Sequence, residues 1–100
     1  MTEAQIVKRI VAAIREAGGY AIKHHGSPYS HAGTPDVLGC LRGRMLAVEV
    51  KRPGKRPTAL QEHELRLWAA CGAIAGVVTS VDDLTALLDT AGLGGILPSA

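Results

Sequence analysis

The chain has 100 residues, 47% of them hydrophobic, and this length suits one domain with a modest core. It contains no Phe, one Trp and two Tyr, so we expect a core of aliphatic side chains. No stretch approaches the length of a membrane-spanning helix, and no long apolar run follows the N-terminal basic residues, so we expect neither a membrane span nor a signal peptide. A net charge of +2 is too small by itself to indicate a nucleic-acid-binding protein.

The first predicted element is a helix, because a T-x-x-Q capping box at Thr2 is followed by apolar residues at helical spacing. Two consecutive glycines, Gly18 and Gly19, end this helix. Residues 20–25 are typical of a short strand, and residues 26–34 form a loop rich in Gly, Ser and Pro.

Two β-rich runs follow, residues 36–41 and 44–51, and a tight turn at Arg42-Gly43 joins them into a hairpin. A loop over 52–57 then leads to a helix that a second capping box opens and that Gly72 ends.

Residues 73–79 predict a further strand, and Ser80 begins a last helix that ends near Gly92. The Gly-rich tail over 92–100 is expected either to be loose or to contact a second subunit.

The predicted element order is therefore α-β-β-β-α-β-α within a single domain, residues 1–100. Both faces of the central hairpin are apolar, and a sheet with two apolar faces needs a cover on each side. The fold class is α/β: a sandwich with a mixed central sheet flanked by helices.

Cys40 and Cys71 lie far apart in sequence, without CxxC or zinc-type spacing. A disulfide framework, a zinc site and an iron–sulfur cluster are therefore not indicated. We expect two buried, reduced thiols and a cytoplasmic protein.

The hairpin turn decides which acidic residues meet. With Leu41 opposite Arg44, Asp36 lies opposite Glu49, and directly opposed side chains on one face have Cβ atoms roughly 5 Å apart. A three-residue loop would shift this register by one and separate the two carboxylates.

Two adjacent carboxylates repel each other, and a hard divalent cation such as Mg²⁺ would compensate their charge. Lys51 lies two residues beyond Glu49, on the same face of the strand, where an ammonium group can position an attacking water or stabilise charge on a phosphate. The alternative for Lys51 is a surface ion pair with one of these acids.

The segments Gly33-Thr34-Pro35-Asp36-Val37 and Glu49-Val50-Lys51, followed by Gln61, resemble the PD-(D/E)xK nuclease superfamily and, within it, a stand-alone VRR-Nuc domain. The resemblance implies a restriction-endonuclease-like sandwich and metal-dependent hydrolysis of DNA. It also implies that Asp36, Glu49 and the Val50 carbonyl bind Mg²⁺ or Mn²⁺, and that Lys51 is the catalytic lysine.

The same resemblance gives catalytic and metal-supporting roles to Gln61 and Glu3, respectively. Each has a simpler alternative, because a capping box explains Gln61 and the helix dipole favours an acid at Glu3.

A cluster of basic residues follows the candidate site, and Arg52, Lys55 and Arg56 are the predicted DNA contacts. The alternative is a solvated loop that happens to be basic. His24, His25 and His31 fit no metal motif, and phosphate contact or simple exposure is expected for them, while Tyr29 receives no role.

The combined hypothesis is a metal-dependent endodeoxyribonuclease, with phage-like origin by resemblance. Since so short a domain leaves no room for a sequence-reading module, we expect selection of branched DNA, as by a Holliday-junction resolvase, and a homodimer with two sites. The alternatives are a nonselective endonuclease or nickase that another protein recruits, and a nuclease-like fold that binds nucleic acid without cutting it.

Overall fold

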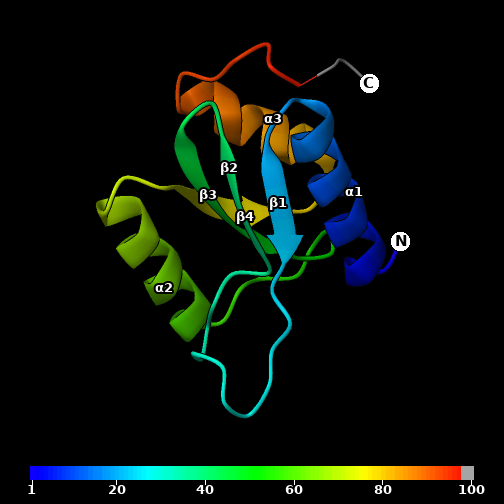
Figure 1. Ribbon diagram of the computed structural model, residues 1–100. Coiled ribbons are helices and arrows are strands. Elements are labelled where there is room, and N and C mark those ends of the chain that lie inside the picture. The colour runs from blue at the N-terminus through cyan, green and yellow to red at the C-terminus, as the bar shows by residue number, and fades with distance from the viewer. Residues whose placement is uncertain (98–100) are drawn as a thin grey trace.

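The computed structural model describes residues 1–97, and its element order is the predicted one (Figure 1). The elements are α1 (Glu3–Glu16), β1 (Tyr20–Lys23), β2 (Val37–Leu41), β3 (Arg44–Val50), α2 (Ala59–Ala70), β4 (Ile74–Val78) and α3 (Val81–Thr90). The first strand is two residues shorter than predicted, because only its first four residues pair with β2.

The four strands form one mixed sheet in the order β1-β2-β3-β4. Strand β2 is antiparallel to both β1 and β3, whereas β4 runs parallel to β3. This parallel pair needs a crossover connection, and α2 supplies it. The mixed α/β sandwich predicted from the sequence is confirmed.

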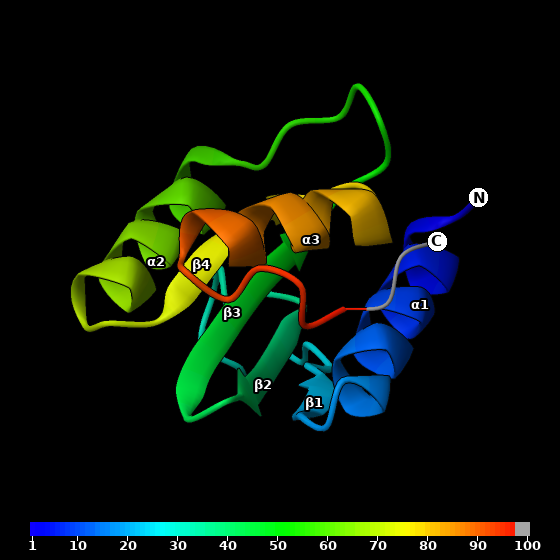
Figure 2. The same cartoon turned by 90° about the horizontal axis from the view of Figure 1, so that it is seen from above.

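The helices cover the two faces of the sheet unequally. Helices α1 and α3 pack on each other and on one face, with α1 contacting β1, β2 and β3 and α3 contacting β4. Helix α2 lies on the other face, against β3 and β4 (Figures 1 and 2). Among residues 1–97, no helix therefore lies over the face of β1 and β2 on the α2 side.

The main core lies between the sheet and the α1–α3 layer, and it is aliphatic, as predicted. Its fully buried members include Ile10, Ile14, Val37, Leu46, Val48, Val50, Val78 and Leu84. Successive residues of a strand point to opposite faces, so the even-numbered side chains of β3 fill this core and its odd-numbered side chains point toward α2.

The connection between β2 and β3 is a two-residue turn. Both of its residues have positive φ, +53° at Arg42 and +76° at Gly43, as in the tight turns that match the twist of a hairpin. Leu41 consequently pairs with Arg44, and the register predicted for the hairpin is confirmed.

Both predicted capping boxes are present. Thr2 and Gln5 exchange side-chain-to-backbone hydrogen bonds at the start of α1, and Thr58 and Gln61 do the same at the start of α2. Each box satisfies two amide groups that the first turn of a helix leaves without partners.

One expectation was wrong, and one of the two alternatives for the tail does not hold over residues 92–97. Cys40 and Cys71 are free thiols, as predicted, but both are exposed, because Cys40 points to the uncovered part of the sheet and Cys71 caps the end of α2. The tail is not loose up to residue 97: Leu97 is buried in the core, and Leu93 and Ile96 pack against it. The remainder of the predicted tail, residues 98–100, lies outside the described residues. Over residues 1–97, no helix combines the length and hydrophobicity needed to cross a membrane.

Candidate active site

Asp36 and Glu49 meet at the open end of the hairpin. The last regular pair of β2 and β3 is Val37 with Val48, so the next pair outward is Asp36 with Glu49. The backbone N–H of Val50 donates a hydrogen bond of 2.9 Å to Asp36 Oδ2, which fixes the Asp36 carboxylate beside β3. The two acids therefore lie side by side, as predicted, and they do so on the face that α2 covers.

The Glu49 side chain is buried, with only 1% of its surface exposed. Its Oε2 atom has no hydrogen-bond partner among residues 1–97. Burial, followed by a hydrogen bond with Asp36 and the repulsion of the Asp36 charge, raises the pKa of Glu49 from 4.5 to about 9, and the charge of Lys51 acts in the opposite direction. A buried carboxylate with an unused oxygen is costly unless a positive charge compensates it.

Lys51 lies directly beyond β3, on the same side as Glu49 and close enough for its charge to favour ionisation of that carboxyl. Its backbone N–H donates to the carbonyl of Val78, which extends the parallel pairing by one step. Within the described part of the chain, its ammonium group forms no ion pair within 4.0 Å of an acid. The alternative of a surface ion pair is therefore not supported.

The two residues predicted to support a metal ion, Val50 and Glu3, differ in their placement. Val50 is the last residue of β3 and adjoins Glu49, as the predicted carbonyl ligand must. Glu3 is in the exposed first turn of α1, and its charge adds the smallest of the contributions that raise the pKa of Glu49. Across residues 1–97, no cluster of three or more His, Cys, Asp or Glu side chains is arranged to hold a metal ion.

Gln61 has a structural role in α2. Its Oε1 accepts a hydrogen bond of 2.9 Å from the N–H of Thr58, and its own N–H donates to the Thr58 hydroxyl. The capping box thus uses the amide oxygen, and within residues 1–97 the amide NH₂ group donates no hydrogen bond, so it can act as a donor to a ligand.

The basic residues Arg52, Lys55 and Arg56 are exposed on the loop that leads from β3 to α2. A turn closed by a hydrogen bond from the Lys55 N–H to the Arg52 carbonyl shapes this loop. The cluster therefore starts directly after Lys51 and faces solvent, as phosphate contacts require.

The sequence did not single out Glu64, which is buried on α2 and lies 2.8 Å from Nε2 of His31. The available signal for Glu64 was its position one helical turn after Leu60, which places this acid on the side of α2 that contacts the 26–34 loop. The contact of Glu64 with His31 was not predictable from the sequence, because it depends on how the loop over residues 26–34 folds back toward α2.

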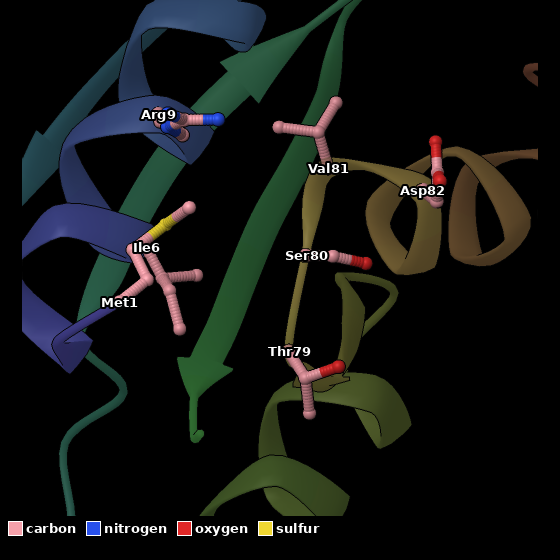
Figure 3. Close-up of a pocket in the computed structure, with 7 residues that line it drawn as sticks. All are labelled: Met1, Ile6, Arg9, Thr79, Ser80, Val81 and Asp82. Atoms are coloured by element: carbon pink, nitrogen blue, oxygen red, sulfur yellow. The ribbon is translucent and has the colours of Figure 1, made fainter. Parts of the chain in front are cut away.

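Two cavities differ in their relation to the acidic pair. One, of about 360 Å³, is lined by the loop between β1 and β2 and includes Asp36 in its wall. Another, of about 230 Å³, lies between the start of α1 and the connection from β4 to α3 (Figure 3). Its lining contains Arg9 and Asp82 but neither Asp36 nor Glu49, so it does not belong to the candidate active site.

Known proteins resemble this chain in sequence and fold. The chain is 38% identical over 88 residues to a protein described as "Putative nuclease p44" from Acyrthosiphon pisum secondary endosymbiont phage 1, and the match covers 86% of this chain and 90% of that protein. No family model matches the chain.

Two solved structures have a similar fold. A VRR_NUC domain superposes with a TM-score of 0.72 at 29% identity, covering 87% of this chain and 94% of its own. Hjc, a Holliday junction resolvase of Archaeoglobus fulgidus, superposes with a TM-score of 0.61 at 23% identity, covering 77% of this chain and 67% of its own. At that identity, the second likeness concerns the fold alone.

Proposed function

Because the chain belongs to the VRR-Nuc family of nucleases, we propose that it is an endodeoxyribonuclease that holds Mg²⁺ or Mn²⁺ between Asp36 and Glu49. The observation that carries this proposal is the buried Glu49 carboxyl, with an oxygen that lacks a partner among the described residues, beside the carboxylate of Asp36. Because its surroundings raise the pKa of Glu49 to about 9, this carboxyl group is favoured with either a proton or a metal ion bound to it.

The donor set fits a hard cation. Mg²⁺ is commonly held by one or two carboxylates together with waters and substrate phosphate oxygens, so the absence of a third acidic side chain in the described site is no obstacle. Asp36 and Glu49 would bind the ion, the Val50 carbonyl would be a third ligand, and Glu3 would support the shell from α1. The ion would lower the pKa of an attacking water and neutralise charge on the scissile phosphate.

Lys51 and the basic loop act on the substrate. The Lys51 ammonium orients the attacking water and stabilises the negative charge that develops on the phosphate. Arg52, Lys55 and Arg56 bind the DNA backbone, and the free NH₂ of Gln61 donates to a phosphate oxygen. Contacts of this kind recognise the shape of DNA and carry no sequence information.

Cleavage of four-way junction, flap, nicked and linear DNA with Mg²⁺ or Mn²⁺ tests this proposal. We expect cutting by the wild type and a loss of at least 100-fold in kcat for Lys51→Ala. Lys8→Ala, on the exposed side of α1, is the control and should cut like the wild type. Equal rates for Lys51→Ala and wild type would remove the lysine from the mechanism.

The substrate pattern separates the remaining alternatives. Preference for the four-way junction supports a resolvase-like enzyme, whereas equal cutting of all substrates supports a nonselective nuclease that another protein recruits. Binding without cutting in either metal would replace the proposal with a nucleic-acid-binding module. The free thiols agree with a reducing compartment, and the cytoplasmic location stays a prediction.

We also propose that the protein is a homodimer joined through the part of the sheet that α2 leaves uncovered. Tyr20 and Ile22 of β1 are 64% and 45% exposed, and the register places them beside Cys40 and Leu38 on that face, with Met45 next in the row. A contiguous apolar surface of this kind is typical of an interface. It lies on the same side of the sheet as Asp36 and Glu49, so a two-fold dimer would present two active sites together.

Sedimentation equilibrium tests the dimer. Ile22→Glu places a charge within the proposed interface, and we expect it to shift the protein toward monomer. Leu67→Glu is the matched control, because Leu67 is also about half exposed but lies on α2. The same distribution of monomer and dimer in the wild type and Ile22→Glu would contradict this interface.

A further inference from the structure

The loop between β1 and β2 carries polar side chains that the proposed reaction leaves without a role. Together with the ends of both strands it surrounds the cavity of about 360 Å³. Cavities of this size are in the range of sites for small organic groups. The polar residues in its lining are His24, Ser27, Ser30, His31, Thr34 and Asp36.

The backbone places His24 next to Asp36. The pairing of β1 with β2 ends at Lys23 and Val37, and the N–H of His24 then donates a hydrogen bond of 2.7 Å to the carbonyl of Asp36. Directly opposed residues of antiparallel strands point to the same face. His24, Asp36 and Glu49 therefore form one row across three strands, with His24 half-buried in the cavity wall.

The loop is attached to α2 on its other side. His31 Nε2 lies 2.8 Å from Oε1 of Glu64, whose side chain is only 10% exposed. Gly33 approaches α2 so closely that a Cβ atom there would lie 2.9 Å from Cγ of Leu60. Figure 1 shows the loop, in cyan, extending beyond the sheet beside the first turn of α2.

The loop also has internal support. The Ser27 N–H donates a hydrogen bond of 2.8 Å to the Ser30 hydroxyl, and the Thr34 hydroxyl donates one of 2.7 Å to the His31 carbonyl. These hydrogen bonds and the contacts with α2 support the walls of the cavity, and a preformed site costs less to fill.

We propose that this cavity binds the nucleotide adjoining the scissile phosphate, and that the His24 imidazole donates a hydrogen bond to an oxygen of its phosphate or sugar. The inference rests on the proposed function, because the scissile phosphate is taken to lie at Asp36 and Glu49. Phosphate and sugar oxygens accept hydrogen bonds, and about half to two-thirds of the hydrogen bonds between proteins and DNA are made to them. Glu64 is a positioning residue, since it acts on DNA only by holding His31 and the loop.

Binding of fluorescein-labelled four-way junction DNA in EDTA, followed by fluorescence anisotropy, tests the subsite without requiring metal or cleavage. His24→Ala should raise Kd about tenfold, the loss expected for one hydrogen bond to a charged group. His24→Gln keeps a donor and should recover most of the affinity. His25→Ala is the matched control, because His25 is exposed and does not line the cavity.

Two variants of Glu64 test the positioning role. Glu64→Ala removes the contact with His31 and should weaken DNA binding in the same direction as His24→Ala, whereas Glu64→Gln keeps an oxygen for His31 and should bind nearly as the wild type does. Thermal unfolding of each variant separates a local effect from loss of the fold. A Tm close to that of the wild type, together with weaker binding, supports positioning.

The outcomes distinguish this subsite from the nuclease proposal. If the wild type cuts DNA with metal but His24→Ala binds as tightly as His25→Ala, the subsite is refuted and the nuclease stands. If the wild type binds without cutting and His24→Ala alone weakens binding, the subsite stands and the hydrolysis is refuted. Failure of the wild type to bind or cut any of the DNA substrates would refute both.

Discussion

The stability of the metal-free protein should fall as pH rises, because of Glu49. Burial first, and then the hydrogen bond with Asp36 and its charge, raise the pKa of Glu49 from 4.5 to about 9 in the folded protein. Between these values the folded protein keeps a proton that the unfolded chain releases. The free energy of unfolding therefore contains a contribution that is fully present below pH 4.5 and is lost progressively as pH rises through about 9.

The size of this effect follows from the linkage between protonation and folding. One proton taken up on folding changes the free energy of unfolding by about 1.4 kcal/mol per pH unit. Raising the pH from about 5.5 to about 7.5 should therefore remove roughly 3 kcal/mol. For a single domain of 100 residues, this corresponds to a decrease in Tm of roughly 12–24 °C.

Urea unfolding in EDTA, followed by the fluorescence of the single tryptophan, Trp68, measures this dependence. Glu49→Gln cannot ionise, and its amide can donate to Asp36 as a protonated Glu49 would, so this variant should lack the decrease. Glu62→Gln, an exposed substitution on α2, is the control and should follow the wild type. Parallel pH profiles for the wild type and Glu49→Gln would refute the reasoning.

A divalent ion should reverse the loss. Mg²⁺ or Mn²⁺ at about pH 7.5 replaces the proton on Glu49, and binding to the folded state alone stabilises it by about 2.7 kcal/mol at an ion concentration of 100 Kd. Glu49→Gln should gain much less, since it keeps only one of the two carboxylates. Equal gains in the two proteins would place the metal ion elsewhere.

Three further predictions concern the turn, the loop and the basic cluster. Arg42→Asn should raise the free energy of unfolding by roughly 1 kcal/mol in urea titrations, because Asn tolerates the φ of +53° at this position better than Arg. Gly33→Ala should weaken DNA binding and destabilise the protein more than Gly54→Ala does; both glycines have positive φ, but only at Gly33 would a Cβ atom meet α2. Replacing Arg52, Lys55 and Arg56 together with Ala should reduce the slope of log K against log salt by about 2.7, and an unchanged slope would identify a merely solvated loop.

The sequence was sufficient for the fold because its patterns are local. Capping boxes at Thr2 and Thr58 mark the starts of two helices, and the two-residue turn at Arg42-Gly43 pairs Leu41 with Arg44, which fixes the register of the hairpin. The Asp36–Glu49 pair follows from that register alone, without knowledge of any distant contact.

The sequence was insufficient where distant parts of the chain meet. The burial of Glu49 depends on elements that close over the end of the hairpin, and the contact between His31 and Glu64 joins residues 33 positions apart across a loop and a helix. Cys40 was expected to be buried because its neighbours are apolar, but α2 covers only β3 and β4, which leaves that part of the sheet open. Coverage of a sheet depends on the length and direction of a helix, and a strand pattern does not contain them.

The packing of the core and the placement of the acids are one structural problem. Val37 and Val48 are opposed, fully buried and directed to the α1–α3 side, so the next pair, Asp36 and Glu49, must point to the α2 side. A shift of the hairpin by one residue would put the acids on opposite faces, and it would also turn Val37 out of the core. The free energy gained by burying aliphatic side chains therefore also keeps the two carboxylates together, against their mutual repulsion.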